Sequence, residues 1–377
     1  TQGISQEEIQ RVLAPYGKLC VKEGGKWLVT TKPKPKEMDD WTHNNHGADG
    51  NLVSNDNAIK FPVNLRWLDG LPNHRGGFGD CAGCRGIVVA GGRIYTVSVD
   101  DVGNLVPAKN DAFLMARDAF NGMPLWKINC RDTYDTTKLD WRNVWPLVAN
   151  DKKVYSPRSV PTTVNNPTTK KAETTFTYEL LIIDGASGKV ETAINTKFQV
   201  KRLLLLDGCL VAACWEKTQF SNHKDGFEND AIRAVWWPSD NGTIDAYDAE
   251  NGKAKWSLPQ NALTMVAADS TLYYLTSKGN PPTSREIVAV ELSTGKEKWR
   301  VPHTTFGEDP DTCLNFAGPN CVVVSKSKGA GKREVNVLSS ADGKVIYNIP
   351  NVTARAIVGN ELWCTDGRYD IKTGKKL

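Results

Sequence analysis

Alternating apolar and polar positions fill most of the chain after residue 80, and they predict short β-strands. Residues 113–118 and 286–291 are two such runs. An Asn-Gly or Thr-Gly pair follows each run and supplies the positive φ of a tight turn. The next alternating run carries a tryptophan. The pattern therefore predicts β-hairpins whose second strand holds an aromatic residue.

An acidic residue, a turn glycine and this aromatic recur together along the chain. The fullest copies are Asp118, Gly122 and Trp126, then Asp248, Gly252 and Trp256, then Glu291, Gly295 and Trp299. Weaker copies have their turn glycines at Gly188, Gly343 and Gly374. A recurrence of this size is typical of propellers and other repeat arrays.

A second hairpin precedes most copies of the repeat, at residues 87–95, 203–211, 265–273 and 356–363. Two hairpins per unit make a four-stranded antiparallel blade. The sequence thus predicts an all-β protein, a β-propeller of four-stranded antiparallel blades behind a short α/β N-terminal extension. Six units can be counted, and they form either a complete ring or part of a larger one.

The repeated aromatic has a structural meaning before any functional one. A large flat side chain near the end of a blade can wedge between neighbouring sheets. We expect Trp126, Trp256 and Trp299 to pack in this way, with Thr192 and Tyr347 as degenerate equivalents. Gly122, Gly252 and Gly295 are the matching structural glycines.

The N-terminal residues predict one helix and one strand. Ser5 with Glu8 has the pattern of a capping box, and Ile9, Val12 and Leu13 fall on one face of the helix. Pro15 to Gly17 should end it.

Residues 80–377 resemble the pyrroloquinoline quinone (PQQ)-like, or quinoprotein alcohol dehydrogenase-like, β-propellers. The resemblance rests on the repeated acidic residue, Thr-Gly-Lys turn and Trp. That family includes quinone-dependent dehydrogenases and non-catalytic scaffolds, so the resemblance specifies a fold and leaves activity open.

A second resemblance rests on residues 11–27, on 32–35 and on 39–51. These segments look like the junction in planctomycete-type proteins that fuse a methyltransferase-like domain to the propeller. The implied division is 1–31 as a methyltransferase remnant, 32–79 as a linker and lead-in loop with a candidate closing strand, and 80–377 as the propeller. On this resemblance the chain begins within a domain, and export to a periplasm-like compartment is expected.

Composition narrows the classes of partner. Lys and Arg number 47 against 43 Asp and Glu, a net charge of +4 that is too small to indicate nucleic-acid binding. The sequence has no apolar run long enough to cross a bilayer. The basic block 32–36 is typical of a Pro-rich linker.

Nine cysteines are present, and only Cys81 and Cys84 have a close metal or redox spacing. A zinc site would need a second pair or histidines nearby. The spacing favours a local disulfide or plain thiols, with a metal site and redox chemistry as alternatives. Cys209 and Cys214 lie in an apolar run and should be buried free thiols.

His43, His46 and Asp49 form the other candidate metal set, since imidazole and carboxylate together suit zinc, iron or copper. Asn, Gly and Asp at this density also make a turn-rich loop whose side chains bond to the backbone. The loop interpretation is favoured, and the metal interpretation is kept as an alternative.

No cofactor is predicted. Dehydrogenases of the resembled family stack the quinone against an adjacent Cys-Cys ring, and this chain has no Cys-Cys dipeptide. PQQ with calcium therefore stays a minority alternative. Catalytic residues are not assignable from the sequence, and we lean against an enzyme.

The favoured function is a non-catalytic binding, scaffolding or complex-assembly propeller with a protein partner or a further chain segment as its ligand. Two insertions, 156–178 and 216–241, suit such binding because function concentrates in loops on a fixed scaffold. The alternatives are a quinone- or metal-dependent oxidoreductase, part of an S-adenosylmethionine-dependent methyltransferase fusion, and a carbohydrate-binding propeller.

Closure of the ring is a separate question, because the sixth unit stops before its aromatic position. Residues 64–68, with Trp67, could supply the missing outer strand. Further blades could also finish the ring, since open sheet edges are normally covered.

Overall fold

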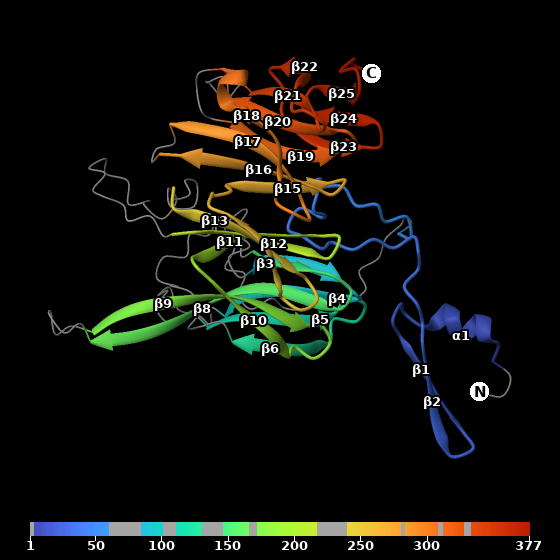
Figure 1. Ribbon diagram of the computed structural model, residues 1–377. Coiled ribbons are helices and arrows are strands. Elements are labelled where there is room, and N and C mark those ends of the chain that lie inside the picture. The colour runs from blue at the N-terminus through green and yellow to red at the C-terminus, as the bar shows by residue number, and fades with distance from the viewer. Residues whose placement is uncertain are drawn as a thin grey trace.

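The computed structural model describes residues 4–59, 84–100, 111–129, 146–165, 172–216, 240–279, 283–307, 312–327 and 333–377. Within these ranges the protein is nearly all β, with a single α-helix. Figure 1 shows antiparallel sheets following one another through the molecule, while the N-terminal helix and hairpin project to one side. The predicted all-β propeller class is confirmed.

Six sheets, here called blades 1 to 6, follow the sequence order. Blade 1 consists of β3 (Cys84–Ala90), β4 (Arg93–Asp100), β5 (Asp111–Asp118) and β6 (Pro124–Asn129). Blade 2 consists of β7 (Val148–Ala149), β8 (Lys153–Asn165), β9 (Ala172–Asp184) and β10 (Val190–Thr196). Blade 3 consists of β11 (Gln199–Leu206), β12 (Cys209–Trp215), β13 (Gly242–Asp248) and β14 (Ala254–Leu258). Blade 4 consists of β15 (Thr264–Ala268), β16 (Thr271–Lys278), β17 (Ser284–Glu291) and β18 (Glu297–Pro302). Blade 5 consists of β19 (Thr312–Gly318), β20 (Cys321–Ser327), β21 (Arg333–Ser339) and β22 (Val345–Pro350). Blade 6 consists of β23 (Ala354–Val358), β24 (Glu361–Cys364) and β25 (Gly367–Asp370). A short 3-10 helix, η4 (His303–Phe306), follows β18.

Every blade is an antiparallel meander in which each strand pairs with the next. Blade 6 has three full strands, and Lys376 forms a bridge to Tyr369 that begins a fourth. The predicted closing strand at 64–68 lies outside the described residues.

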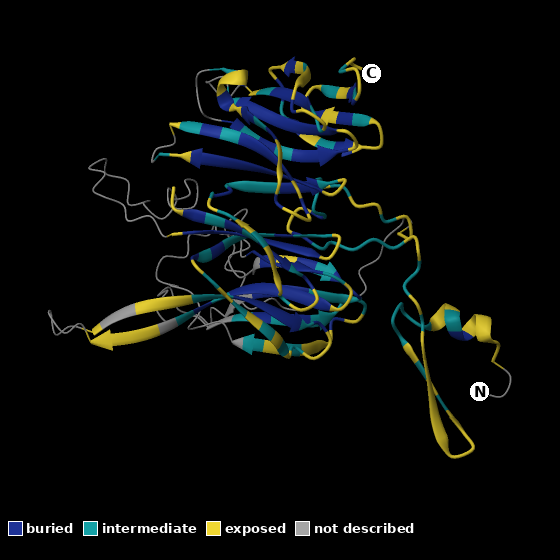
Figure 2. Cartoon of the chain, viewed as in Figure 1, coloured by how far each residue is buried: buried dark blue, intermediate teal, exposed yellow. Residues whose placement is uncertain are grey.

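The hydrophobic core lies between adjacent blades. One cluster joins each successive pair of blades, for example Val88 and Tyr95 with Leu147 and Ile183 between blades 1 and 2. Figure 2 shows the buried residues along the central strands and the exposed ones on the projecting hairpins. Both faces of an inner blade are therefore covered, which explains the nearly continuous apolar runs of strands such as β12.

The acidic residue of the repeat shapes the turn that follows it. In blade 3 the Asp248 carboxylate accepts the backbone N–H groups of Glu250 and Asn251 at 2.9 and 3.1 Å. The Gly252 N–H then donates to the Asp248 carbonyl at 2.8 Å, and Gly252 has a φ of 76°. Asp118, Asp184 and Asp370 make the same kind of turn. The recurring acid is accounted for by local turn geometry.

The recurring aromatic forms a contact between blades that we call the rim joint. The Trp256 ring lies against Gly295 of the next blade, where a Cβ would come within 2.7 Å of the ring. Its Nε1–H donates to the Leu292 carbonyl at 2.9 Å. Equivalent joints are made by Trp126 on Gly188 with Gly185, Trp299 on Gly343 with Ser340, and Tyr347 on Gly374 with Ile371. Trp299 is buried, whereas Trp126 and Trp256 are half-buried.

The joint between blades 2 and 3 is built differently. Thr192 and Ile194 take the place of the aromatic ring, and each would lie about 3.0 Å from a Cβ on Gly252. The missing donor comes from another strand, because the Tyr155 hydroxyl on β8 donates to the Ala249 carbonyl at 3.0 Å. That carbonyl occupies the position that accepts from the tryptophan or tyrosine in the other joints. The joint therefore keeps the hydrogen bond and loses the flat ring.

The N-terminal arm consists of α1 (Gln6–Val12) and a hairpin of β1 (Lys18–Glu23) with β2 (Lys26–Thr31). Ser5 Oγ accepts the Glu8 N–H at 3.1 Å, as expected for a capped helix start. The structure has a second strand where one was predicted, because Gly24 and Gly25 form a turn at positive φ. Ile9 is buried but Val12 is 62% exposed, because one short helix on a two-stranded hairpin has little surface to cover it.

Candidate functional site

Residues 41–51, here called the axial segment, cross the innermost strand of every blade. The segment makes a hydrogen bond to each blade in turn. Its partners, from blade 1 to blade 6, are Val89 at 2.8 and 2.7 Å, Ala149 at 3.0 Å, Leu205 at 3.0 Å, Ala267 at 2.7 Å, Ala317 at 2.9 Å and Ile357 at 2.8 and 3.0 Å.

These six partners occupy equivalent positions. Each partner lies on the first strand of its blade and pairs with the residue of the second strand that comes five places later in the chain, as Val89 pairs with Ile94 and Ile357 with Leu362. Among the described residues, no strand lies beyond the first strand of a blade, so its outward N–H groups need other acceptors. The axial segment supplies one acceptor to each blade, and it ties all six to a single piece of chain.

His43 provides the acceptor for blade 3 with its ring. Its Nε2 accepts the Leu205 N–H at 3.0 Å, which places the proton on Nδ1, 2.8 Å from Thr42 Oγ1. Burial, reinforced by the neighbouring His46, lowers the pKa of His43 to about 4. The imidazole is therefore neutral at physiological pH, and both ring nitrogens are engaged in holding the segment.

His46 closes a tight turn inside the segment. Its φ is 69°, its carbonyl accepts the His43 N–H at 3.2 Å, and its ring meets the Trp41 ring edge-on at 5.2 Å. His46 Nε2 lies 2.6 Å from Asp39 Oδ2. Burial would raise the pKa of Asp39, but hydrogen bonds from the Asn55 N–H and from His46 outweigh it and lower that pKa.

Asp49 and Asn51 complete the segment. Asp49 Oδ1 accepts the Asn51 N–H at 3.1 Å, and burial raises the pKa of Asp49. The Asn51 side chain both accepts from and donates to the Ile357 backbone. Asn51 was missed as a key residue because nothing in its local sequence distinguishes it from other loop asparagines.

The candidate metal residues are distributed as follows. His43, His46 and Asp49 lie in one segment with hydrogen-bond partners within the protein, Cys84 begins β3, and Cys81 lies outside the described residues. Within the described ranges, no group of three or more His, Cys, Asp or Glu side chains is placed to hold a metal ion. The metal site thus stays a prediction. Cys209 and Cys214 are buried free thiols, as expected.

A polar hollow of about 470 Å³ lies beside the start of the axial segment. It is lined by Asp40, Thr42, Asn150, Asp151, Lys152 and Glu250. Burial raises the pKa of Asp40, although the ion pair with Lys34 opposes this. The hollow is lined by both acidic and basic side chains.

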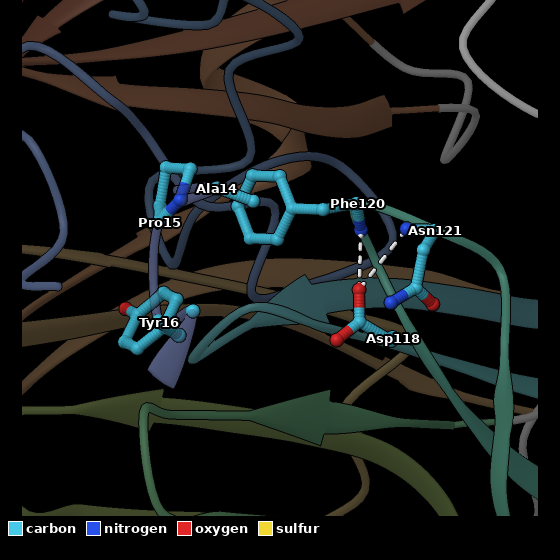
Figure 3. Close-up of a pocket in the computed structure, with 7 residues that line it drawn as sticks. Ala14, Pro15, Tyr16, Asp118, Phe120 and Asn121 are labelled. Carbon is cyan, nitrogen blue, oxygen red and sulfur yellow. Dashed lines mark hydrogen bonds between the residues drawn. The ribbon is translucent and has the colours of Figure 1, made fainter. Parts of the chain in front are cut away.

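A second pocket, of about 380 Å³, lies between the N-terminal arm and blade 1 (Figure 3). Tyr16 and Phe120 line it with ring centroids 6.4 Å apart, and the Asp118 turn forms another side. The Tyr16 ring packs on Gly92, where a Cβ would come within 2.5 Å of it. Burial raises the pKa of Tyr16 to about 12. Tyr16 therefore fixes the arm to blade 1.

The arm carries exposed apolar side chains beyond this anchor. Trp27, Leu28 and Val29 of β2 are 65%, 52% and 57% exposed. Trp27 and Val29 alternate along the strand and lie on one face, where Cys20 of β1 pairs with Val29. Adjacent exposed apolar residues of this kind are typical of protein-binding surfaces.

The two predicted insertions differ in how much of them is described. Residues 156–178 are mostly two long strands, the distal parts of β8 and β9, which project as a ribbon in Figure 1. Of 216–241, only residues 216, 240 and 241 lie in the described part of the chain. Among the described residues, no helix is long and apolar enough to cross a membrane.

No protein-family model and no curated protein matches the sequence. Solved structures match in fold. A quinohemoprotein alcohol dehydrogenase from Pseudomonas putida HK5 aligns at 16% identity and a TM-score of 0.51, over 90% of this chain and 50% of that one. A europium-containing methanol dehydrogenase aligns at 14% and 0.51, over 85% and 59%. BamB from Moraxella catarrhalis aligns at 10% and 0.40, over 77% and 83%.

This chain has a β-propeller fold, which it shares with these solved structures. It spans about half the length of the alcohol dehydrogenase that it matches. At such identities the likeness concerns the fold, because the same fold hosts unrelated functions.

Proposed function

We propose that this chain is a binding and scaffolding propeller whose ligand is another polypeptide. The observation that carries the proposal is the exposed strand Trp27–Leu28–Val29 on an arm that Tyr16 anchors to blade 1. The axial segment supports it by tying six blades to one piece of chain. A rigid body with an apolar, unpaired hairpin suits capture of a partner strand or surface.

The second resemblance suggests a narrower form of the same proposal. If the partner surface belongs to a methyltransferase-like domain, the hairpin face of Trp27 and Val29 packs into that domain and the propeller serves as its scaffold. Export is part of the proposal through the family resemblance. Cell fractionation checks it, and recovery of the mature protein with cytoplasmic markers would contradict it.

Site-specific photocrosslinking in cells that make the protein tests the partner. A photoreactive phenylalanine analogue replaces Trp27 in one variant and exposed Ile87 of β3 in the matched control. We expect one crosslinked polypeptide from position 27 and none from position 87. Identical products from both positions, or no product from position 27, would refute the polypeptide ligand.

A quinone-dependent oxidoreductase is the second candidate, because two solved structures with TM-scores of 0.51 are quinoprotein dehydrogenases. Its test is reconstitution with PQQ and calcium, followed by the absorbance spectrum and dye-linked alcohol oxidation. A bound quinone band at one per chain would establish this candidate.

Carbohydrate binding is favoured by one feature, the pocket in which Tyr16 and Phe120 lie beside Asn121. Aromatic rings with a neighbouring amide suit a sugar ring, which offers an apolar face and hydroxyls. A glycan array with wild type and Phe120→Ala distinguishes it: binding lost in the variant would support a sugar site here.

A further inference from the structure

The longest strands of the protein form a ribbon that leaves its own blade. β8 and β9 pair over their whole lengths, from Lys153 with Asp184 to Asn165 with Ala172. β7 covers only Val154 and Tyr155 of β8, and β10 covers β9 only between residues 178 and 183. Among the described residues, no neighbouring strand covers the outer edges of 157–165 and 172–177. Figure 2 shows most of this part as exposed.

The pairing pattern fixes which backbone groups face each edge. The Asn150 N–H donates to the Lys153 carbonyl and closes the turn between β7 and β8. Lys153 thus points its backbone groups toward β7, and every second residue after it does the same. The β8–β9 register has no bulge, so this parity continues to Asn165.

The β8 edge is protected against strand addition. Pro157 and Pro161 stand at positions whose backbone nitrogens face outward, and proline has no N–H to donate. An incoming strand would find no donor for two of its carbonyl groups there. Prolines at such positions are a common defence of exposed sheet edges.

The β9 edge has no such protection. The outward-facing, odd-numbered residues of β8 pair with even-numbered residues of β9. Ala172, Thr174 and Phe176 therefore point their N–H and C=O groups outward. The Asp184 N–H, which bonds to Lys189 on the β10 side, has the same parity. Residues 172–177 contain no proline and are rich in threonine, which favours strands. This free edge continues directly from the part of β9 that β10 covers.

We propose that residues 172–177 of β9 pair with the same residues of a second copy of this chain. An antiparallel two-fold pairing centred on Thr174 sets Ala172 opposite Phe176 and uses all three outward positions of each copy. Such a pairing is self-complementary, and it covers both free β9 edges at once. The proline-protected β8 edges then stop growth at two copies.

The test is sedimentation equilibrium of the whole chain with two matched variants. Thr174→Pro removes an outward N–H from the β9 edge, and Thr163→Pro removes one from the β8 edge directly across the ribbon. Neither residue bonds to the other strand of the ribbon through its backbone, so both variants should keep it. Because small interfaces are weak, the measurement extends to about 0.1 mM protein.

We expect a monomer–dimer equilibrium for wild type and for Thr163→Pro, and a dissociation constant raised about tenfold or more for Thr174→Pro, because two interface hydrogen bonds are lost. Amide hydrogen exchange should show Thr174 and Phe176 becoming protected as wild-type concentration rises. A wild type that stays monomeric over this range, or two proline variants that weaken the dimer equally, would overturn the proposal.

Discussion

The rim joints and the axial segment fasten the same six blades in opposite ways. A rim joint repeats the same contact, a ring on a turn glycine with one hydrogen bond to the next blade, as Trp256 does with Gly295 and Leu292. The axial segment makes eight hydrogen bonds to six blades from one short stretch. Most use main-chain atoms of the segment, one uses a histidine ring, and the last two use an asparagine amide.

The difference shows where each contact draws its stability. A rim joint buries a large apolar ring, so its energy follows the area removed from water. An axial contact satisfies a backbone group that would otherwise be unpaired near the centre, so its energy follows the cost of losing a hydrogen bond. Breaking a rim joint should therefore lower the free energy of unfolding most. Breaking an axial contact should act mainly on the blade that the contact touches.

Trp299→Ala should have the largest effect on the rim. Trp299 is buried between blades 4 and 5, and truncation of such a residue costs about 3–5 kcal/mol. Thr192→Ala, at the joint that lacks a ring, should cost about 1 kcal/mol because little apolar area is lost. Chemical denaturation of both variants gives the comparison, and equal losses would show that the ring does not carry the joint.

The axial segment should make stability fall in mild acid. His43 has its pKa lowered to about 4 by burial, against about 6.5 in the unfolded chain. Below pH 6.5 the unfolded state takes up a proton that the folded state refuses, so stability falls as pH drops from about 6.5 toward 4. The integrated loss is about 3 kcal/mol. In His43→Gln this part of the pH dependence should disappear from melts at pH 7 and pH 4.5, and an unchanged profile would contradict the assignment.

Asn51→Ala sharpens the comparison by breaking the last axial contact. Two hydrogen bonds to Ile357 are lost, at a cost of about 1–3 kcal/mol. Hydrogen exchange should accelerate in β23 and little in β3, since the hydrogen bonds removed from the Asn51 side chain go to Ile357 of blade 6. Asn57→Ala, which removes only an exposed bond to Asn55, is the control. Uniform acceleration across all blades would mean that the segment acts as one unit.

Tyr155→Phe should have the smallest effect. The change removes the hydroxyl that donates to the Ala249 carbonyl and keeps the ring, so we expect a loss of about 1 kcal/mol. If the hydroxyl replaces the missing tryptophan donor, combining the change with Thr192→Trp should recover part of that loss. Denaturation of the single and double variants measures it; no recovery would show that the position cannot host a ring.

Much of the fold could be predicted because its determinants are local. Alternation of apolar residues predicts the strands, and an acidic residue four places before a glycine predicts all the outer turns but the one at Gly343, as at Asp248 and Gly252. The arm was predicted less well. Gly24 and Gly25 add a second strand, and Val12 is exposed because a small arm offers too little surface to cover it.

The candidate site could not be predicted from local sequence patterns. Histidines three residues apart are compatible with a metal or with a loop, and the sequence of 41–51 does not say which groups it will meet. The structure supplies Leu205 as the donor to His43 and Ile357 as the partner of Asn51, residues 162 and 306 positions away.

The sequence by itself determined the strands, the turns and the repeated aromatic, because each depends on neighbours within one hairpin. Only the tertiary structure decided that residues 41–51 run across all six blades and that Tyr155 donates where a tryptophan is missing. It also decided which edge of the β8–β9 ribbon stays open. Those outcomes depend on backbone groups that hairpin formation leaves unpaired, and their partners exist only once distant blades have come together.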